Sequence, residues 1–260
     1  MLKIQNVAFD LLRAGNVAIG IGLRQARTVD IAPAMKTAGF DWLFIDMEHN
    51  SMDLDTVVQI CVAARLAGIS PVVRVPGFQH FHASRVLDGG AQGIVFPHVD
   101  DAETAAQLVD FCRYPPDGHR SIYGTLPQID FKAHPQHEVV GAINESTLIV
   151  VMLESPKAIS NVDAIAAVPG VDSVLIGTSD LTLEMGIPGQ LEHSDVTAAY
   201  GAMIAACEKH GKYPGMGGIY EPALLQKYVG MGVRLVLAGS DLSLLLSAAK
   251  QRVADVREAK

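Results

Sequence analysis

Two acidic residues in this chain stand directly after apolar runs, where they could hold a metal ion. Glu154 ends the run TLIVVML, and Asp180 follows VLIG and two small hydroxyl residues. Carboxylates at neighbouring strand ends can share a hard divalent cation, with water and substrate oxygens completing the coordination. Taken singly, each carboxylate is better explained as the cap of the helix that follows it. Together, and with the residues described next, they predict one metal ion between Glu154 and Asp180.

A histidine and an arginine supply the other reactive groups. The segment IDMEHN places Asp46 and Glu48 shortly before His49. A histidine held by a carboxylate is a good general base near neutral pH, and we predict this role for His49 with Asp46. Arg74 follows the apolar residues PVV. There its guanidinium can polarise a carbonyl or hold an oxyanion, or it can form an ion pair with Asp46 or Glu48.

Backbone groups near Asp180 offer a place for a small anion. The stretch Gly177–Thr178–Ser179–Asp180 opens a predicted helix, so its free N–H groups suit a carboxylate. We therefore expect Gly177, Ser179 and Asp180 to bind substrate. The segments GMGG (215–218) and AGSD (238–241) are weaker candidates for a phosphate, because no Lys or Arg stands beside them.

These residues need a frame that brings strand ends together, and the chain repeats a suitable unit. A helix-like stretch, a glycine and a short apolar run recur, and such runs are typical of buried parallel strands. The eight predicted strands are 17–22, 42–46, 71–74, 93–96, 148–153, 173–176, 214–217 and 234–238. Strands alternating with helices predict a single (β/α)8 TIM barrel, in which active sites lie at the carboxyl ends of the strands. The alternative, an open doubly wound sheet, is disfavoured because the first turn, GIGLRQART, lacks the glycine pattern G-x-G-x-x-G.

One domain accounts for residues 1–260, with two features outside the regular repeat. Residues 113–147 form a long insertion rich in Pro, Gly and His, with one short helix at 137–145, and we interpret it as a lid or a subunit contact. A C-terminal helix is predicted at about 241–257. Its apolar run DLSLLLSAA predicts a buried face, which packing within the chain or between subunits would explain equally well.

Composition excludes several classes of partner. The chain of 260 residues has a net charge of −8, which argues against binding to nucleic acid. No run approaches the roughly 18 apolar residues of a membrane span, and no signal peptide is evident, so we expect a cytoplasmic protein. The three cysteines, Cys61, Cys112 and Cys207, are predicted to be buried thiols.

With these residues in place, the sequence resembles the HpcH/HpaI aldolases, the metal-dependent class II pyruvate aldolases. The segments that carry the resemblance are FDWLFIDMEHN (40–50), PVVRV (71–75), LDGGAQGIVFPHV (87–99), RYPPDGHRS (113–121), the stretch at 153–181, GIPG (186–189) and LAGSD (237–241). The resemblance implies reversible cleavage of 4-hydroxy-2-oxo acids to pyruvate and an aldehyde. It also implies a homohexamer with exchanged C-terminal helices.

The resemblance also implies a role for each site residue. Glu154 and Asp180 would bind Mg²⁺, Mn²⁺ or Co²⁺, and His49 with Asp46 would be the acid/base pair. Arg74 would contact the keto oxygen of pyruvate, and the backbone of Ser179 and Asp180 its carboxylate. One departure is Met152, where many relatives have Gln; it puts the range of accepted aldol products in question.

Two other functions remain open on the sequence. One is a related Mg²⁺-dependent barrel lyase that acts on acyl-CoA or citrate-like substrates. The other is a barrel that binds an oxo acid without catalysis. A requirement for coenzyme A would distinguish the first, and a lack of metal-dependent turnover the second.

Overall fold

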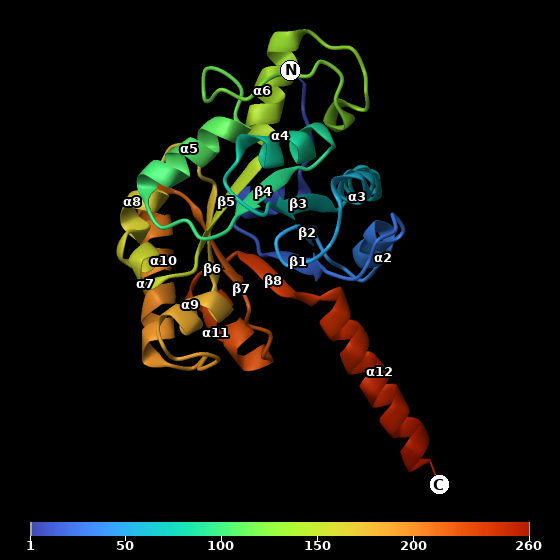
Figure 1. Ribbon diagram of the computed structural model, residues 1–260, viewed down its shortest axis with the longest axis vertical. Helices are drawn as coiled ribbons and strands as arrows, with labels where there is room; N and C mark the ends of the chain where they lie inside the picture. Colours follow the sequence, from blue (N-terminus) through green and yellow to red (C-terminus); the bar gives the residue numbers. More distant parts are fainter. Residues whose placement is uncertain (1, 260) are drawn as a thin grey trace.

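Eight parallel strands close into a barrel in the order β1 to β8, and helices surround it (Figure 1). The computed structural model describes residues 2–259. The strands are β1 Ala18–Leu23, β2 Trp42–Asp46, β3 Ser70–Arg74, β4 Gly93–Phe96, β5 Leu148–Leu153, β6 Ser173–Gly177, β7 Tyr213–Gly217 and β8 Leu235–Ser240. All eight predicted strands are present, with ends displaced by at most two residues. The predicted (β/α)8 barrel is confirmed.

The helices alternate with the strands as the sequence predicts. Their bounds are α1 Val7–Arg13, α2 Ile31–Thr37, α3 Leu54–Ala67, α4 His80–Asp88, α5 Ala102–Cys112, the 3₁₀ turn η1 Pro127–Ile129, α6 Gln136–Ser146, α7 Pro156–Ser160, α8 Val162–Ala166, α9 Thr178–Glu184, α10 Ser194–His210, α11 Pro222–Met231 and α12 Asp241–Glu258. All three cysteines are buried free thiols. No helix within residues 2–259 is long and apolar enough to cross a membrane.

Side chains of the strands alternate between two cores. One set packs outward against the helices, and the other fills the barrel interior with residues that include Trp42, Phe44, Val72, Val150, Met152 and Leu175. Because successive side chains in a strand point to opposite faces, residues two apart share a face. The interior positions of β2, β3, β5 and β6 therefore continue to Asp46, Arg74, Glu154 and Gly177 at the carboxyl end of the barrel.

Asn6 joins the N-terminal segment to the amino end of the barrel. This residue is 1% exposed, and its amide donates to the carbonyls of Gln92 and Ser146 at 2.9 and 2.8 Å. Its Oδ1 accepts from the Ser70 hydroxyl at 2.9 Å and, as the cap of α1, from the backbone N–H of Phe9. One side chain therefore satisfies four polar groups.

We expect Asn6→Ala to lower the free energy of unfolding by about 2 kcal/mol, because it leaves several of these buried groups without partners. Urea unfolding measures the loss. Asn16→Ala is the matched control, since Asn16 is exposed. Equal stabilities of the two variants would contradict the role given to Asn6.

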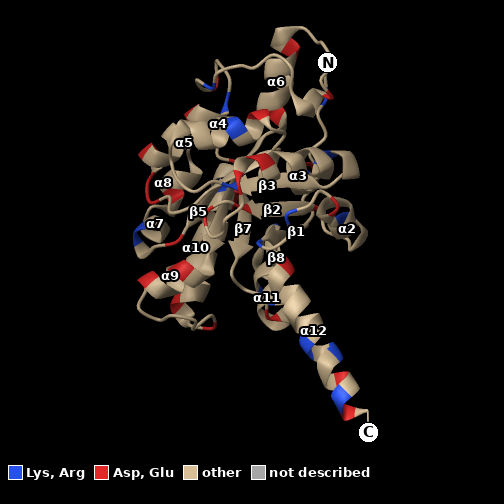
Figure 2. Ribbon diagram, turned by 45° about the vertical axis from the view of Figure 1, so that its right-hand side comes forward, with Lys and Arg blue, Asp and Glu red and all other residues tan. Residues whose placement is uncertain are grey.

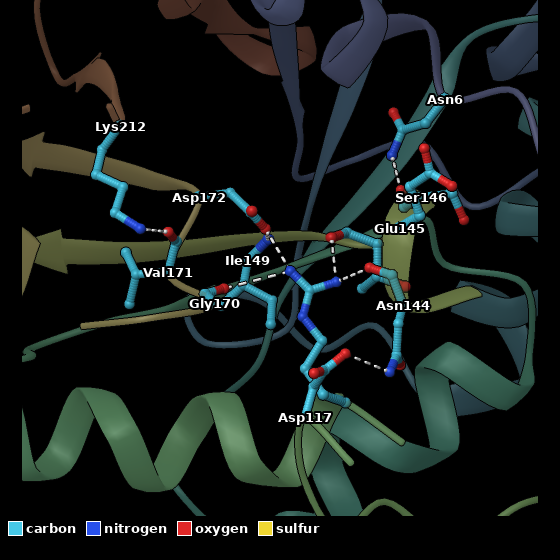
Figure 3. A network of polar contacts seen from close by, with 12 residues as sticks. Asn6, Asp117, Asn144, Glu145, Ser146, Ile149, Gly170, Val171, Asp172 and Lys212 are labelled. Atoms are coloured by element: carbon cyan, nitrogen blue, oxygen red, sulfur yellow. Dashed lines mark hydrogen bonds and ion pairs between the residues drawn. The ribbon is translucent and has the colours of Figure 1, made fainter. Parts of the chain in front are cut away.

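The insertion at 113–147 lies at the amino end of the barrel, away from the strand ends predicted to carry the chemistry. Arg113 is 5% exposed and donates to Asp172 before β6 at 2.8 Å and to the carbonyl of Thr147 before β5 at 3.0 Å. Figure 3 shows this network around Asp172 and Asn144. The predicted helix is present as α6. A lid over the chain's own site is wrong, because α5 has already returned the chain to the amino end before the insertion begins.

The C-terminal helix α12 extends away from the barrel (Figure 1). None of its residues is buried, and Leu244, Leu245 and Leu246 are 46, 64 and 48% exposed. Charged residues gather on its outer half, and its first turns beyond Asp241 lack them (Figure 2). The predicted helix is confirmed, but packing of its apolar face within the chain is wrong.

Candidate active site

A cavity of about 300 Å³ opens at the carboxyl end of the barrel. Most of the residues predicted to act lie around it. Its lining comprises Arg24, Phe44, His49, Arg74, Met152, Glu154, Gly177, Thr178, Ser179, Asp180, Gly217, Gly218, Tyr220 and Leu237. Asp46 lies behind Arg74 and does not line it. The structure therefore brings the sequence-predicted residues into one place.

Arg74 forms the centre of an ion-paired group. Its Nε and NH2 donate to the two oxygens of Asp46 at 3.0 and 2.6 Å, a bidentate pair. Its NH1 lies 2.8 Å from Glu48 Oε2 in an ion pair without hydrogen-bond geometry. Burial by itself would raise the pKa of Asp46, but the hydrogen bonds and charge of Arg74 bring it below its ordinary value. Arg74 keeps N–H groups on NH1 that can reach a ligand in the cavity.

The ring of His49 does not pair with Asp46 as the sequence predicts. Asp46 Oδ1 accepts the backbone N–H groups of Glu48 and His49 at 3.0 and 3.2 Å, so it fixes the turn after β2. The imidazole Nε2 lies 3.9 Å from Glu48 Oε2, and its side chain is 49% exposed. Arg74 occupies both oxygens of Asp46, and the carboxylate that pairs with the imidazole is that of Glu48.

Glu154 carries a buried carboxylate with one free oxygen. The residue is 1% exposed; its Oε2 accepts the backbone N–H of His98 at 2.8 Å. Within residues 2–259, Oε1 has no hydrogen-bond partner. The pKa of Glu154 is raised from 4.5 to about 7, mainly by burial and also by the charge of Asp180, while the contacts with His98 and the charge of Arg74 oppose the rise. A buried carboxylate of this kind requires a positive partner.

The backbone after β6 is held in place by contacts with β7. Thr178 is buried, and its hydroxyl donates to the carbonyl of Gly217 at 2.8 Å and pairs with the Tyr200 hydroxyl at 2.8 Å. Gly218 has φ of +86°, and a Cβ there would lie 3.1 Å from the Ser179 nitrogen. Glycine at 218 therefore keeps the N–H of Ser179 open to the cavity.

Glu154 and Asp180 fit a divalent cation that retains open coordination positions. The free oxygen of Glu154 can bind a cation, whose charge would offset the burial that raises the pKa of this carboxyl, and Asp180 can add a second oxygen ligand. Within residues 2–259, no group of three or more His, Cys, Asp or Glu side chains is arranged around a metal position. Two carboxylates leave room for water and substrate oxygens, as hard cations such as Mg²⁺ accept.

Several residues of the site have no assigned role in the sequence prediction. Arg24 and Tyr220 line the cavity from the loops after β1 and β7. His98 has φ of +51° and lies 3.4 Å from Glu154 and 3.6 Å from Glu48. Arg24, His98 and Tyr220 each follow a strand directly or within a few residues. This position in the sequence was the feature that could have identified them. Their roles depend on side-chain direction, which strand spacing does not give.

The segment AGSD does not form a phosphate cradle. Asp241 accepts the backbone N–H groups of Arg24, Gln25 and Ala26 at 2.8 to 2.9 Å, so a carboxylate of the chain itself occupies that place. A larger cavity of about 860 Å³ lies at the amino end of the barrel, beside α6 and the insertion. The strand-end carboxylates are absent from its lining, so we place the active site in the smaller cavity.

Comparisons with known proteins identify relatives over most of the chain. The HpcH/HpaI aldolase/citrate lyase family matches residues 24–248. A 4-hydroxy-4-methyl-2-oxoglutarate aldolase of Hapsidospora irregularis is 38% identical over 259 residues, covering 96% of this chain and 94% of that protein. A 5-keto-4-deoxy-D-glucarate aldolase of Klebsiella pneumoniae is 36% identical over 252 residues, covering 94% of this chain and 93% of that protein. The crystal structure of an HpcH/HpaI aldolase from Desulfitobacterium hafniense has a TM-score of 0.94 at 31% identity, covering 98% of each chain.

Proposed function

The chain belongs to the HpcH/HpaI aldolase/citrate lyase family, and we propose that it is a metal-dependent carbon–carbon lyase that reversibly cleaves 4-hydroxy-2-oxo acids to pyruvate and an aldehyde. The observation that carries this proposal is the buried Glu154 carboxylate, with its free oxygen beside Asp180 in the mouth of the barrel. The relatives whose names describe aldolases of oxo acids support the same chemistry.

Glu154 and Asp180 would hold one divalent cation, for which Mg²⁺, Mn²⁺ and Co²⁺ are the candidates. When bound, this cation supplies Lewis-acid stabilisation of the negative charge that develops on the pyruvyl half of the substrate. The backbone N–H groups of Ser179 and Asp180 would receive the carboxylate of the oxo acid, and Gly218 leaves that of Ser179 accessible.

The remaining residues would orient the substrate and move a proton. Arg74, fixed by Asp46 and Glu48, offers a rigid N–H toward the keto oxygen. Cleavage removes the proton of the 4-hydroxyl group, breaks the C3–C4 bond and leaves an electron pair that is later protonated at C3. His49 is half-exposed at the mouth and would take and return this proton, directly or through water.

Pyruvate release from a simple 4-hydroxy-2-oxo acid tests the proposal. We expect no activity after removal of metal and recovery on addition of Mg²⁺, Mn²⁺ or Co²⁺, as read by a coupled assay for pyruvate. A requirement for coenzyme A would instead indicate the acyl-CoA lyase. Metal binding without turnover of any substrate would indicate a non-catalytic binder.

We also propose that the chain assembles with copies of itself through α12, and that the assembly is a hexamer. The proposal is supported by the exposed leucines on a helix that the barrel does not cover. An apolar helix face of this kind normally packs against another surface.

We expect the double variant Leu244→Glu/Leu245→Glu to dissociate toward the 27.7 kDa monomer, because the new charges disfavour burial of this face. Light scattering after size exclusion gives the mass. Arg252→Glu changes the net charge by the same amount on the outer half of α12 and should leave the assembly intact. A parent protein that is already monomeric would contradict the proposal.

A further inference from the structure

Arg24 places a second guanidinium in the cavity, across the barrel from the carboxylates. It directly follows β1, and in a closed barrel of eight strands β1 lies four strands from β5, which ends at Glu154. Arg24 therefore lies across the mouth from Glu154, where it can meet the far end of a substrate held at Glu154 and Asp180. Arg24 and Arg74 are both part of the lining.

The two guanidinium groups differ in what they already bind. Arg74 forms a bidentate pair with Asp46 and an ion pair with Glu48. Arg24 NH2 lies 3.6 Å from Asp46 Oδ2, beyond hydrogen-bond distance, and its side chain is 40% exposed. Among residues 2–259, the Arg24 guanidinium donates no hydrogen bond. Its N–H groups therefore remain available to a ligand.

The backbone of Arg24 is firmly held even though its guanidinium is free. Its N–H donates to Asp241 Oδ1 at 2.9 Å, and the next two N–H groups donate to Oδ2 of the same carboxylate. The carbonyl of Arg24 accepts from Arg27 NH1 at 2.8 Å. A fixed backbone reduces the entropy lost when the side chain binds a ligand.

Tyr220 lines the same cavity as Arg24, from the loop after β7. Burial raises the pKa of the Tyr220 phenol, and the charges of Arg24 and Arg74 oppose this rise. The phenol is protonated at neutral pH and can donate a hydrogen bond. Arg24 and Tyr220 therefore present a cation and a neutral donor together, a combination that suits a carboxylate.

We propose that Arg24, with Tyr220, binds a carboxylate on the half of the substrate that leaves as the aldehyde or ketone. This inference rests on the proposed function and names its substrate class: 4-hydroxy-2-oxo acids that carry a second carboxylate at the far end. Glu154 and Asp180 place two carboxylates in the lining of the cavity, so a second anionic group of the substrate needs a local cation there. Arg24 has this charge, and its planar fork can hold a carboxylate in two hydrogen bonds.

A matched pair of substrates tests the role of Arg24. 4-Hydroxy-2-oxoglutarate and 4-hydroxy-2-oxopentanoate differ by a carboxylate in place of a methyl group at the far end. We expect Arg24→Gln to lower the ratio of their kcat/KM values about 10- to 100-fold, the size of a charge-assisted contact, mainly through KM for the diacid. Arg24→Lys should restore part of the ratio. Lys36→Gln, which removes an exposed positive charge from α2, is the control and should leave the ratio unchanged.

A binding measurement keeps this inference separate from the proposed function. 2-Oxoglutarate and 2-oxopentanoate differ in the same way and cannot undergo aldol cleavage, so calorimetry with Mg²⁺ present needs no turnover. We expect Arg24→Gln to weaken 2-oxoglutarate selectively. An equal effect of Arg24→Gln on both ligands, or on both substrates, would overturn the role of Arg24. Absence of cleavage of either substrate by the parent protein would instead refute the lyase, and the binding pair would still decide the role of Arg24.

Discussion

Glu154→Gln is expected to lower kcat/KM by at least about 10³-fold, the largest effect of any single substitution considered for this chain. The variant keeps the shape of the side chain and an oxygen that can accept the N–H of His98, but it removes the negative charge that would hold the cation. Calorimetry should show that metal binding is lost together with activity. Exposed Glu184 of α9 provides the control Glu184→Gln, which should bind metal normally.

The same substitution should not destabilise the metal-free protein. The pKa of Glu154 is raised in the fold from 4.5 to about 7, so the folded state binds this proton more tightly than the unfolded state does. The stability of the metal-free parent should therefore fall as pH rises through this range, and the variant should lack this loss. A Glu154→Gln protein that unfolds earlier than the parent at pH 8 would contradict the raised pKa of the buried Glu154 carboxyl.

The affinity for the metal should depend on pH through the titration of the Glu154 carboxyl. Below pH 7 a proton occupies Glu154 and competes with the cation, so the apparent affinity should rise with pH and level off above it. His98, Asp180 and Arg74 are the charged neighbours that adjust this midpoint. Calorimetry in buffers of different ionisation enthalpy would detect the proton released on binding.

The second large effect is expected at Arg74. Arg74→Lys should lower kcat/KM by about 10²- to 10³-fold, because lysine keeps the charge but cannot hold both oxygens of Asp46 while it faces the substrate. The loss should fall mainly on kcat, because we propose that the Arg74 guanidinium contacts the keto oxygen of the substrate, where negative charge develops. Unfolding in urea should also show a loss of about 1–3 kcal/mol, because Asp46 is fully buried.

Arg85→Lys is the matched control for Arg74→Lys. Arg85 lies exposed on α4, outside the cavity, and its replacement should change neither kcat/KM nor stability. A lowered stability of Arg74→Lys with an unchanged kcat would show that Arg74 only supports the fold, and would remove it from the mechanism.

Much of the fold follows from patterns within short stretches of the chain. Strand positions were predicted within two residues because a buried parallel strand needs a short apolar run, which a helix and a glycine separate from the next. The alternation of side chains along a strand then places Asp46, Arg74, Glu154 and Gly177 inside the mouth. Each of these inferences depends on residues near one another in the sequence.

The hydrogen-bond and ion-pair partners of these side chains could be identified only in the closed barrel. Arg74 occupies Asp46 from the neighbouring strand, so the predicted pair of Asp46 with the His49 ring does not form. Asp241 reaches the loop after β1 because β8 pairs with β1 when the barrel closes. Such contacts join residues far apart in the sequence, and side-chain direction in the loops decides them.

The sequence by itself therefore determined the barrel and the set of residues at its mouth, because strand period and strand ends are local properties of the chain. The tertiary structure determined that the guanidinium of Arg74 is paired with Asp46 while that of Arg24 remains free. It also placed the insertion at 113–147 at the amino end of the barrel. It also left α12 uncovered. These outcomes depend on which elements become neighbours when eight strands close on themselves.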